Sequence, residues 1–111
     1  MHEYSVAADI AKIVSQTAKG RPVKKITLAI GAFSGIFSES LLMYLELVLP
    51  EMGMNDVSIE TNDVPASFVC SCGTHYTAES MTTLCPQCGG YERSIKSGHE
   101  CTIESIEVED D

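Results

Sequence analysis

The first part of the chain has the pattern of an amphipathic helix followed by a stop. Apolar residues recur at positions i, i+4, i+7 and i+8, and this stripe consists of Val6, Ile10, Ile13 and Val14. Gly20 accepts the left-handed conformation that commonly follows a helix, and Pro22 cannot continue one. The pattern therefore predicts a helix that buries one face and ends near residue 20.

Two later segments alternate apolar and polar residues with the period of a half-buried strand. One covers residues 26–32, with Ile26, Leu28, Ile30 and Ala32 on one face, and the other covers residues 57–62, with Val57, Ile59 and Thr61 on one face. The helical stripe between them consists of Leu41, Leu45, Val48 and Leu49. Ser38 is the predicted N-cap of this helix, and Pro50 and Gly53 are its predicted end.

The apolar periodicity stops between Pro65 and Gly98, where Cys, Gly, Thr and Ser dominate. Such a segment is not expected to build its own core, so something else must hold it together. Residues 101–109 then have the pattern of a last strand. Ile103 and Ile106 cannot share one face of a regular strand, which predicts either a bulge near Ser105 or a strand buried on both faces. We therefore predict an α+β fold in which two helices and a small mixed sheet (residues 1–64 and 99–111) are interrupted by an inserted zinc-ribbon-like module (residues 65–98).

Charge and composition narrow the possible functions. The 111 residues include 7 Lys plus Arg and 16 Asp plus Glu, for a formal charge of −9. Such a negative surface repels phosphate backbones and disfavours nucleic-acid binding. The longest apolar run, residues 41–45, is stopped by Glu46, and no basic segment precedes an apolar stretch at the N-terminus. We therefore expect a cytoplasmic protein without a membrane span, whose five cysteines are metal ligands or free thiols rather than disulfides.

Four of the cysteines form two pairs that can close a tetrahedral zinc site, namely Cys70 with Cys72 and Cys85 with Cys88. The glycines after Cys72 and Cys88 allow tight turns whose N–H groups can point toward the sulfurs. The second pair has the common C-x2-C spacing, but the first is one residue short. His75 could therefore take the place of Cys70. A site with four protein ligands is closed, and this predicts a structural zinc rather than a catalytic one.

The N-terminus offers a second set of metal donors. His2 follows Met1 directly, and because His is bulky the initiator should not be trimmed. The α-amine, the imidazole and intervening backbone nitrogens can form fused chelate rings in one plane, which suits Ni(II) or Cu(II) better than zinc. Taken alone, however, these residues are more simply interpreted as a helix start, with Glu3 favoured near its positive end.

The combination of these features resembles the HypA/HybF family, the nickel-insertion accessory factors for NiFe-hydrogenase. The resemblance rests on Met-His-Glu-Tyr-Ser-Val at residues 1–6, Ile-Gly-Ala-Phe-Ser-Gly at residues 30–35, the four-cysteine module, and Ser-Ile-Glu-Val-Glu at residues 105–109. The shortened first cysteine pair departs from the family, which usually has C-x2-C there. The resemblance implies a nickel domain of two helices and a small sheet, with a zinc domain inserted before the last strand.

The resemblance also implies specific ligands and partners. Transferable Ni(II) would be bound by the Met1 amine, His2 and the backbone nitrogen of Glu3, and structural Zn(II) by Cys70, Cys72, Cys85 and Cys88. The implied partners are a nickel-binding maturation GTPase similar to HypB and a hydrogenase large-subunit precursor. The implied function is that of a metallochaperone and not of an enzyme. The chain contains no P-loop, nucleophile elbow or H-E-x-x-H motif that would suggest catalysis.

Some alternatives remain open from the sequence. A zinc site with C-x-C and C-x2-C pairs also resembles that of redox-regulated heat-shock chaperones, so a redox-regulated zinc protein is the alternative function. Cys101 is expected to be a core thiol rather than a ligand. His99 could supply a further nickel donor if the module folds toward the N-terminus. The acidic residues at the end of the chain, Glu107, Glu109, Asp110 and Asp111, are expected to be a solvated tail.

Overall fold

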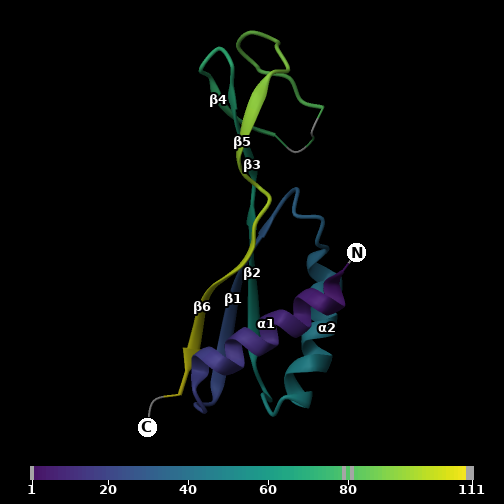
Figure 1. The fold of residues 1–111 in the computed structure, drawn as a ribbon, viewed down its shortest axis with the longest axis vertical. Coiled ribbons are helices and arrows are strands. Elements are labelled where there is room, and N and C mark those ends of the chain that lie inside the picture. Colours follow the sequence, from purple (N-terminus) through teal and green to yellow (C-terminus); the bar gives the residue numbers. More distant parts are fainter. Residues whose placement is uncertain (1, 79, 81, 110–111) are drawn as a thin grey trace.

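The chain forms an elongated molecule with a three-stranded sheet at each end (Figure 1). A computed structural model describes residues 2–78, 80 and 82–109, and its principal extents are 55 × 28 × 17 Å. The elements in chain order are α1 (Glu3–Ala18), β1 (Val23–Gly31), α2 (Ser38–Glu51), β2 (Ser58–Val64), β3 (Ala66–Cys70), β4 (His75–Ala78), β5 (Arg93–Ser97) and β6 (Cys101–Val108). Neither helix in the described part of the chain is long and apolar enough to cross a bilayer.

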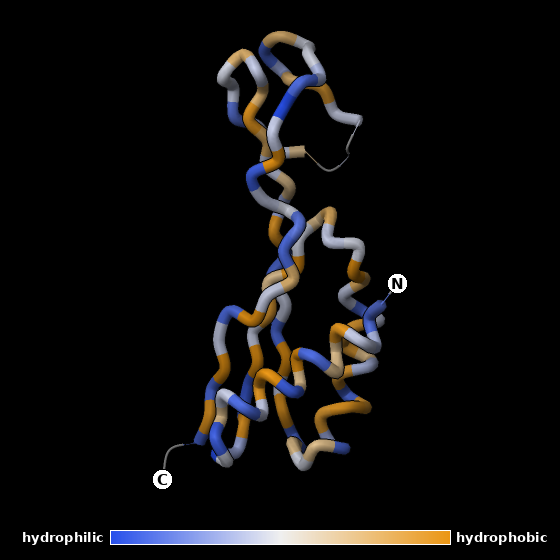
Figure 2. Tube along the Cα trace, viewed as in Figure 1, coloured by the Kyte–Doolittle hydropathy of each residue, from blue (hydrophilic) through white to orange (hydrophobic). Residues whose placement is uncertain are grey.

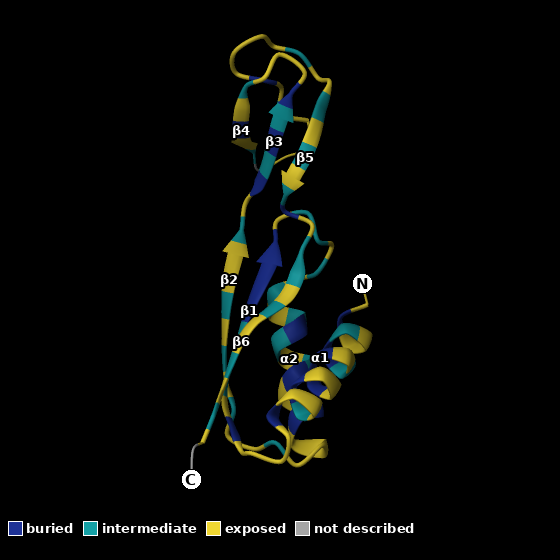
Figure 3. Cartoon of the chain, turned by 60° about the vertical axis from the view of Figure 1, so that its left-hand side comes forward, coloured by how far each residue is buried: buried dark blue, intermediate teal, exposed yellow. Residues whose placement is uncertain are grey.

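The larger unit is a mixed sheet covered on one face by the two helices (Figures 1 and 3). Its strand order is β2-β1-β6, with β1 parallel to β2 and antiparallel to β6. Hydrophobic and hydrophilic positions alternate along its strands (Figure 2). The predicted apolar residues of β1 and α2 form the centre of its core, which includes Ile26, Leu28, Ile30, Leu41, Leu45, Val48 and Leu49. The predicted α+β architecture, with the last strand returning after the inserted segment, is therefore confirmed.

Four details of this unit differ from the prediction. Ile13 is 51% exposed, because α1 buries the stripe through Ala7, Ala11 and Ala18 in addition to Ile10 and Val14. Small alanines let α1 pack closely, so its buried face is rotated relative to the stripe of large side chains. Ala32 lies beyond the end of β1 and is exposed.

The other two differences concern the ends of α2. The N-cap position is occupied by Phe37, without a side-chain capping hydrogen bond, and Ser38 is already helical. Pro50 lies inside the last turn rather than ending the helix. The helix stops one residue later, and Gly53 then adopts φ +84°, in the left-handed region that favours glycine.

Of the two alternatives for the last strand, the bulge is the one that the structure contains. Thr27 pairs with Ser105 and Leu28 with Ile103, so Glu104 has no partner of its own in β1. The extra residue changes which side chains of β6 point to the same face of the sheet. As a result, Ile103 and Ile106 both pack against the core that α1, β1 and α2 form. The sequence located this irregularity to within one residue.

The inserted segment builds a small core of its own, which corrects the expectation that it could not. Strands β4, β3 and β5 form an antiparallel sheet. Its core consists of Ala66, Phe68, Cys70, Tyr76 and Cys85, with Phe33 packed against it from the loop after β1. Two of the cysteines therefore contribute apolar surface to this core as well as thiol groups.

The two sheets are joined where three backbone segments meet. The Gly31 N–H donates to the Glu100 carbonyl at 2.6 Å, the Ala32 N–H to the Val64 carbonyl at 2.9 Å, and the Phe33 N–H to the Gly98 carbonyl at 2.7 Å. A Cβ atom at Gly31 would lie 2.2 Å from the Gly98 oxygen. The junction thus needs glycine because the backbones approach closer than any side chain allows.

Candidate metal centres

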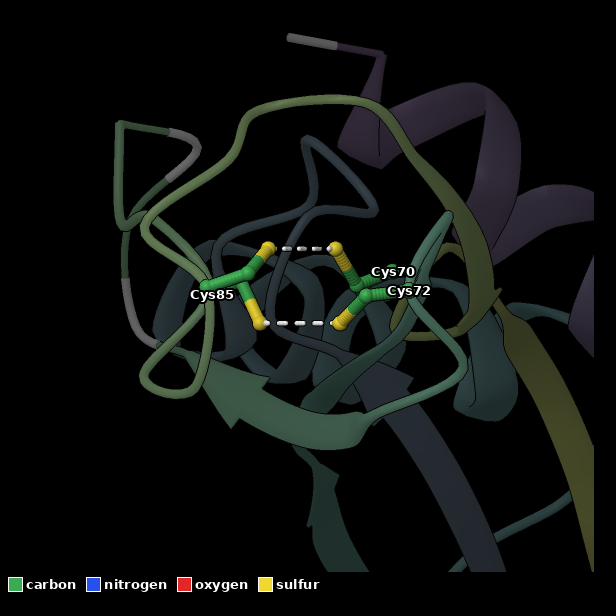
Figure 4. A group of neighbouring side chains, drawn as sticks. Cys70, Cys72 and Cys85 are labelled. Carbon is green, nitrogen blue, oxygen red and sulfur yellow. Dashed lines mark hydrogen bonds between the residues drawn. The ribbon is translucent and has the colours of Figure 1, made fainter.

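The four predicted zinc ligands come together at the far end of the smaller sheet. Cys70 ends β3 and Cys72 follows in the turn to β4, while Cys85 and Cys88 lie in the loop between β4 and β5. All four Sγ atoms lie within 4.8 Å of one another. Figure 4 shows the thiol of Cys85 facing those of Cys70 and Cys72 across the cluster. Tertiary folding therefore brings together two pairs that are separated by a loop in the sequence.

Local turns set the direction of each pair. In the first turn the Gly73 N–H donates to the Cys70 carbonyl at 2.8 Å, and in the second the Gly89 N–H donates to the Cys85 carbonyl at 2.9 Å. Gly73 has φ +94° and Gly89 has φ +72°, so both adopt the conformation that glycine permits. The prediction that glycines make these turns possible is confirmed.

Hydrogen bonds to sulfur support the thiolate form of several ligands. The Gln87 N–H points at Cys85 Sγ at 3.4 Å, and the Gly90 N–H points at Cys88 Sγ at 3.3 Å. In the first turn the Cys72 thiol donates to the Thr74 hydroxyl at 3.2 Å, and the ionised thiolate can accept from the same hydroxyl. Sequence reasoning foresaw the backbone donors but missed Thr74, although its place two residues after a cysteine was a usable signal.

The pKa values of Cys72, Cys85 and Cys88 differ, because each has different hydrogen-bond donors and because one ionised thiol makes it harder for a neighbouring thiol to ionise. The hydrogen bonds from the Thr74 hydroxyl and N–H lower the pKa of Cys72 to about 6. The Cys88 N–H lowers the pKa of Cys85. The Gly90 N–H also lowers the pKa of Cys88, but the three other thiols and burial raise it to about 12. A divalent cation among the four sulfurs would compensate this mutual repulsion.

The spacing of the sulfurs fits zinc. A zinc–sulfur bond of ~2.3 Å gives a tetrahedron whose edges are about 3.8 Å long. The distance from Cys70 Sγ to Cys88 Sγ is 3.5 Å, and that from Cys72 Sγ to Cys85 Sγ is 3.8 Å. These two distances are close to that edge, and all four sulfurs lie within 4.8 Å of one another, so the four donors can surround one ion.

The alternative zinc ligand His75, the fifth cysteine and the possible nickel donor His99 all lie outside this cluster. His75 begins β4 and is exposed, and among the described residues the cluster that could hold a metal ion contains Cys70 and not His75. Cys101 is partly buried against the core of the larger unit, where burial raises the pKa of its thiol. His99 is exposed in the connection between β5 and β6. The shortened first pair therefore does not prevent Cys70 from joining the other three thiols.

Arg93 organises the module around the cysteines and was not foreseen from the sequence. Its guanidinium lies 4.4 Å from the ring centroids of both Phe68 and Tyr91, as a cation between two aromatic faces. The same group donates to the Thr83 carbonyl and to the Tyr76 hydroxyl, the latter at 3.3 Å. The strands and the loop that carry the cysteines are thereby tied together by one side chain.

The predicted nickel donors lie at the start of α1. His2 is exposed at the N-cap position, and its carbonyl accepts the Val6 N–H at 2.9 Å. Glu3 is 7% exposed, and its carboxylate accepts the Phe37 N–H at 3.2 Å. Hydrogen bonding to the N-terminal amine and to this N–H lowers the pKa of Glu3 to about 2. Met1, the third predicted contributor, lies outside the described residues.

Comparisons with known proteins agree over almost the whole chain. Residues 1–108 match the family described as HypA, hydrogenase/urease nickel incorporation, metallochaperone. Hydrogenase maturation factor HypA of Dehalococcoides mccartyi is 33% identical over 115 residues, which cover 100% of this chain and 97% of the relative. The protein of the same name from Caldanaerobacter subterraneus is 37% identical over 114 residues, with 98% and 100% covered. The solution structure of the Ni metallochaperone HypA from Helicobacter pylori shares the fold, with a TM-score of 0.69 at 21% identity and 97% of each chain covered.

Proposed function

The chain belongs to the HypA family of nickel-incorporation metallochaperones, and from this premise we propose that it binds Ni(II) at its N-terminus and delivers it for NiFe-hydrogenase maturation. The observation that carries the proposal is the extent of the family match, which begins at residue 1 and so includes the Met-His-Glu opening. Nickel is the cargo in this proposal, and no substrate is chemically transformed.

The proposed nickel donors are the Met1 amine, the His2 imidazole and the backbone nitrogen of Glu3. Exposure of His2 supports this assignment, because a cargo ion must be reachable by the protein that receives it. A donor set of nitrogens held in one plane matches the preference of Ni(II) for square-planar coordination. These donors are adjacent along the chain, so their chelate rings close without any long-range contact.

We further propose that Cys70, Cys72, Cys85 and Cys88 hold a structural Zn(II). The tetrahedral spacing of the sulfurs and the N–H donors to Cys85 and Cys88 support zinc as the ion. Zinc would neutralise the charge of the thiolates and contribute folding energy to a module with a small core.

Each of the two proposed metal sites belongs to a different proposed domain. Residues 1–64 and 99–111 would form the nickel-binding domain, and residues 65–98 the zinc-binding domain. The proposed partners are a nickel-binding maturation GTPase similar to HypB, which would supply or accept the ion, and a hydrogenase large-subunit precursor as recipient. This exchange would take place in the cytoplasm.

A nickel titration of three proteins tests the proposal. Calorimetry should show that an extension before Met1 and the substitution His2→Ala both weaken Ni(II) binding, because the first removes the free amine and the second the imidazole. Zinc content should not change, since the cysteines are untouched. Binding should also weaken as the pH falls, because protons compete for the nitrogen donors. Undiminished nickel affinity in the extended protein would place the nickel site elsewhere. A redox-regulated zinc protein would instead be indifferent to both changes.

A further inference from the structure

The side chain of Glu3 is unusual for its place in the chain. Among the described residues it is the one buried side chain that carries a charge, with 7% of its surface exposed. Removing a carboxylate from water is unfavourable unless hydrogen bonds replace the lost solvation. Because Glu3 is buried despite this cost and lies beside the proposed nickel donors, its carboxylate is expected to have a specific structural role there.

The contact that Glu3 makes links the beginnings of two helices. Its Oε2 atom accepts the backbone N–H of Phe37 at 3.2 Å, across 34 positions of the sequence. Phe37 is the N-cap residue of α2, while Glu3 is the first residue of α1. The negative carboxylate thus lies near the positive ends of both helices, which stabilises its charge. Figure 1 shows the beginnings of α1 and α2 next to each other.

The Phe37 N–H that donates to Glu3 belongs to a loop that is held at its other end as well. The ring of Phe33 packs into the core of the smaller sheet, 6.2 Å from the ring of Phe68. The Ile36 N–H donates to the Ser34 hydroxyl at 3.2 Å within the loop. The Phe37 N–H is therefore a fixed anchor rather than a group on a free segment.

We propose that the Glu3 side chain is a positioning residue for nickel, which holds the first turn of α1 against the Phe37 N–H and is not itself a ligand. The inference rests on the proposed N-terminal nickel site and deepens it. One carboxylate oxygen accepts the loop N–H, and in this proposal residue 3 offers nickel its backbone nitrogen. That nitrogen and His2 directly precede the anchored side chain, so anchoring it restricts both donors before the ion arrives.

The hydrogen bond between Glu3 and Phe37 keeps the backbone of the first turn of α1 ordered, and the loss of this order determines how much nickel affinity should fall. A loosened first turn must be ordered when nickel binds, at the cost of fixing about one residue, so binding should be weaker by about ten-fold, which corresponds to about 1.4 kcal/mol. The loss should occur whichever partner of the hydrogen bond is removed.

Four variants test this hydrogen bond, and Phe37→Pro removes it while leaving the other hydrogen bonds of the Glu3 carboxylate in place. Glu3→Ala removes the acceptor, whereas Glu3→Gln keeps an acceptor oxygen and nearly the same volume. Phe37→Pro removes the donor, and the observed φ of −88° is close to the value near −65° that proline requires. Phe37→Ala is the matched control, because it removes the ring but keeps the N–H. Each variant is measured for Ni(II) affinity by calorimetry, for the visible absorption of square-planar Ni(II), for zinc content and for thermal unfolding.

The proposal expects nickel affinity to fall about ten-fold in Glu3→Ala and Phe37→Pro and to stay within about three-fold of the native value in Glu3→Gln and Phe37→Ala. The absorption spectrum of the bound ion should be the same in all four, since the donors are unchanged. Native affinity in Glu3→Ala and Phe37→Pro, even with a lower unfolding temperature, would reduce the contact to a structural one and overturn the proposal. A changed spectrum in Glu3→Gln would make the carboxylate a ligand and also overturn it. Failure of the N-terminal site itself would be distinct, because His2→Ala would then bind nickel normally.

Discussion

Adding one methyl group at Gly31 or Gly98 should loosen the junction between the two sheets. At Gly31 the new Cβ would lie 2.2 Å from the Gly98 carbonyl oxygen, and at Gly98 it would lie 2.6 Å from the Cα of Ala66. The atoms in the way are backbone atoms and the Cβ of Ala66, so no side chain can rotate to make room. Gly98 also has φ +112°, a conformation that alanine rarely adopts.

The magnitude can be estimated from these distances. Ordinary contacts of a Cβ begin at 3.4 Å, so the shortfalls are about 1.2 Å at Gly31 and about 0.8 Å at Gly98. Overpacking of this kind costs ~1–3 kcal/mol, and a positive φ adds ~1–2 kcal/mol. We therefore expect ~1–3 kcal/mol for Gly31→Ala and ~2–5 kcal/mol for Gly98→Ala, out of a total stability of roughly 5–15 kcal/mol.

Gly35→Ala separates the two causes. Gly35 has φ +77° but nothing within 4 Å of a Cβ, so this variant carries the backbone strain without the collision. Urea unfolding of the metal-loaded proteins, followed by circular dichroism, measures each loss as a shift in midpoint. With a slope of ~1–3 kcal/mol per molar urea, Gly98→Ala should unfold at least ~0.7 M earlier than the native chain. The reasoning about the junction is refuted if Gly98→Ala and Gly31→Ala are both no less stable than Gly35→Ala.

The cysteine module supports three further predictions. Elemental analysis should find one zinc per chain in the native protein and in Cys101→Ser but none in Cys85→Ser, and zinc loss from Cys101→Ser alone would contradict the assigned ligands. In zinc-free protein the thiolate of Cys72 forms above a pKa of about 6 and is lost as the pH falls through that value, so iodoacetamide at pH 7 should alkylate it before Cys88, whose pKa is about 12. Equal rates would argue against the charge distribution described above. Arg93→Met removes a cation between two rings and two hydrogen bonds, which should weaken the module by about 2 kcal/mol and speed zinc transfer to a chromogenic chelator. An unchanged transfer rate would show that Arg93 does not hold the cysteine loops.

Features governed by local spacing could be predicted from the amino-acid order. The stripe from Leu41 to Leu49 predicted the buried face of α2, because helical periodicity decides which side chains share a face. The phase slip between Ile103 and Ile106 predicted the bulge in β6 for the same kind of reason. Paired cysteines with glycines after them likewise predicted a compact thiol cluster, since each pair and its turn form one local unit.

Contacts between distant segments were decided by the tertiary structure alone. The apolar stripe of α1 suggested Ile13 as a core residue, but the approach of the helix to the sheet buries the alanines and leaves Ile13 half exposed. Nothing in the order of residues shows that Glu3 meets Phe37 or that Arg93 lies between two rings. Periodicity reports which side of an element is apolar, whereas such contacts depend on how two elements approach each other, and that is set by the packing of the whole chain.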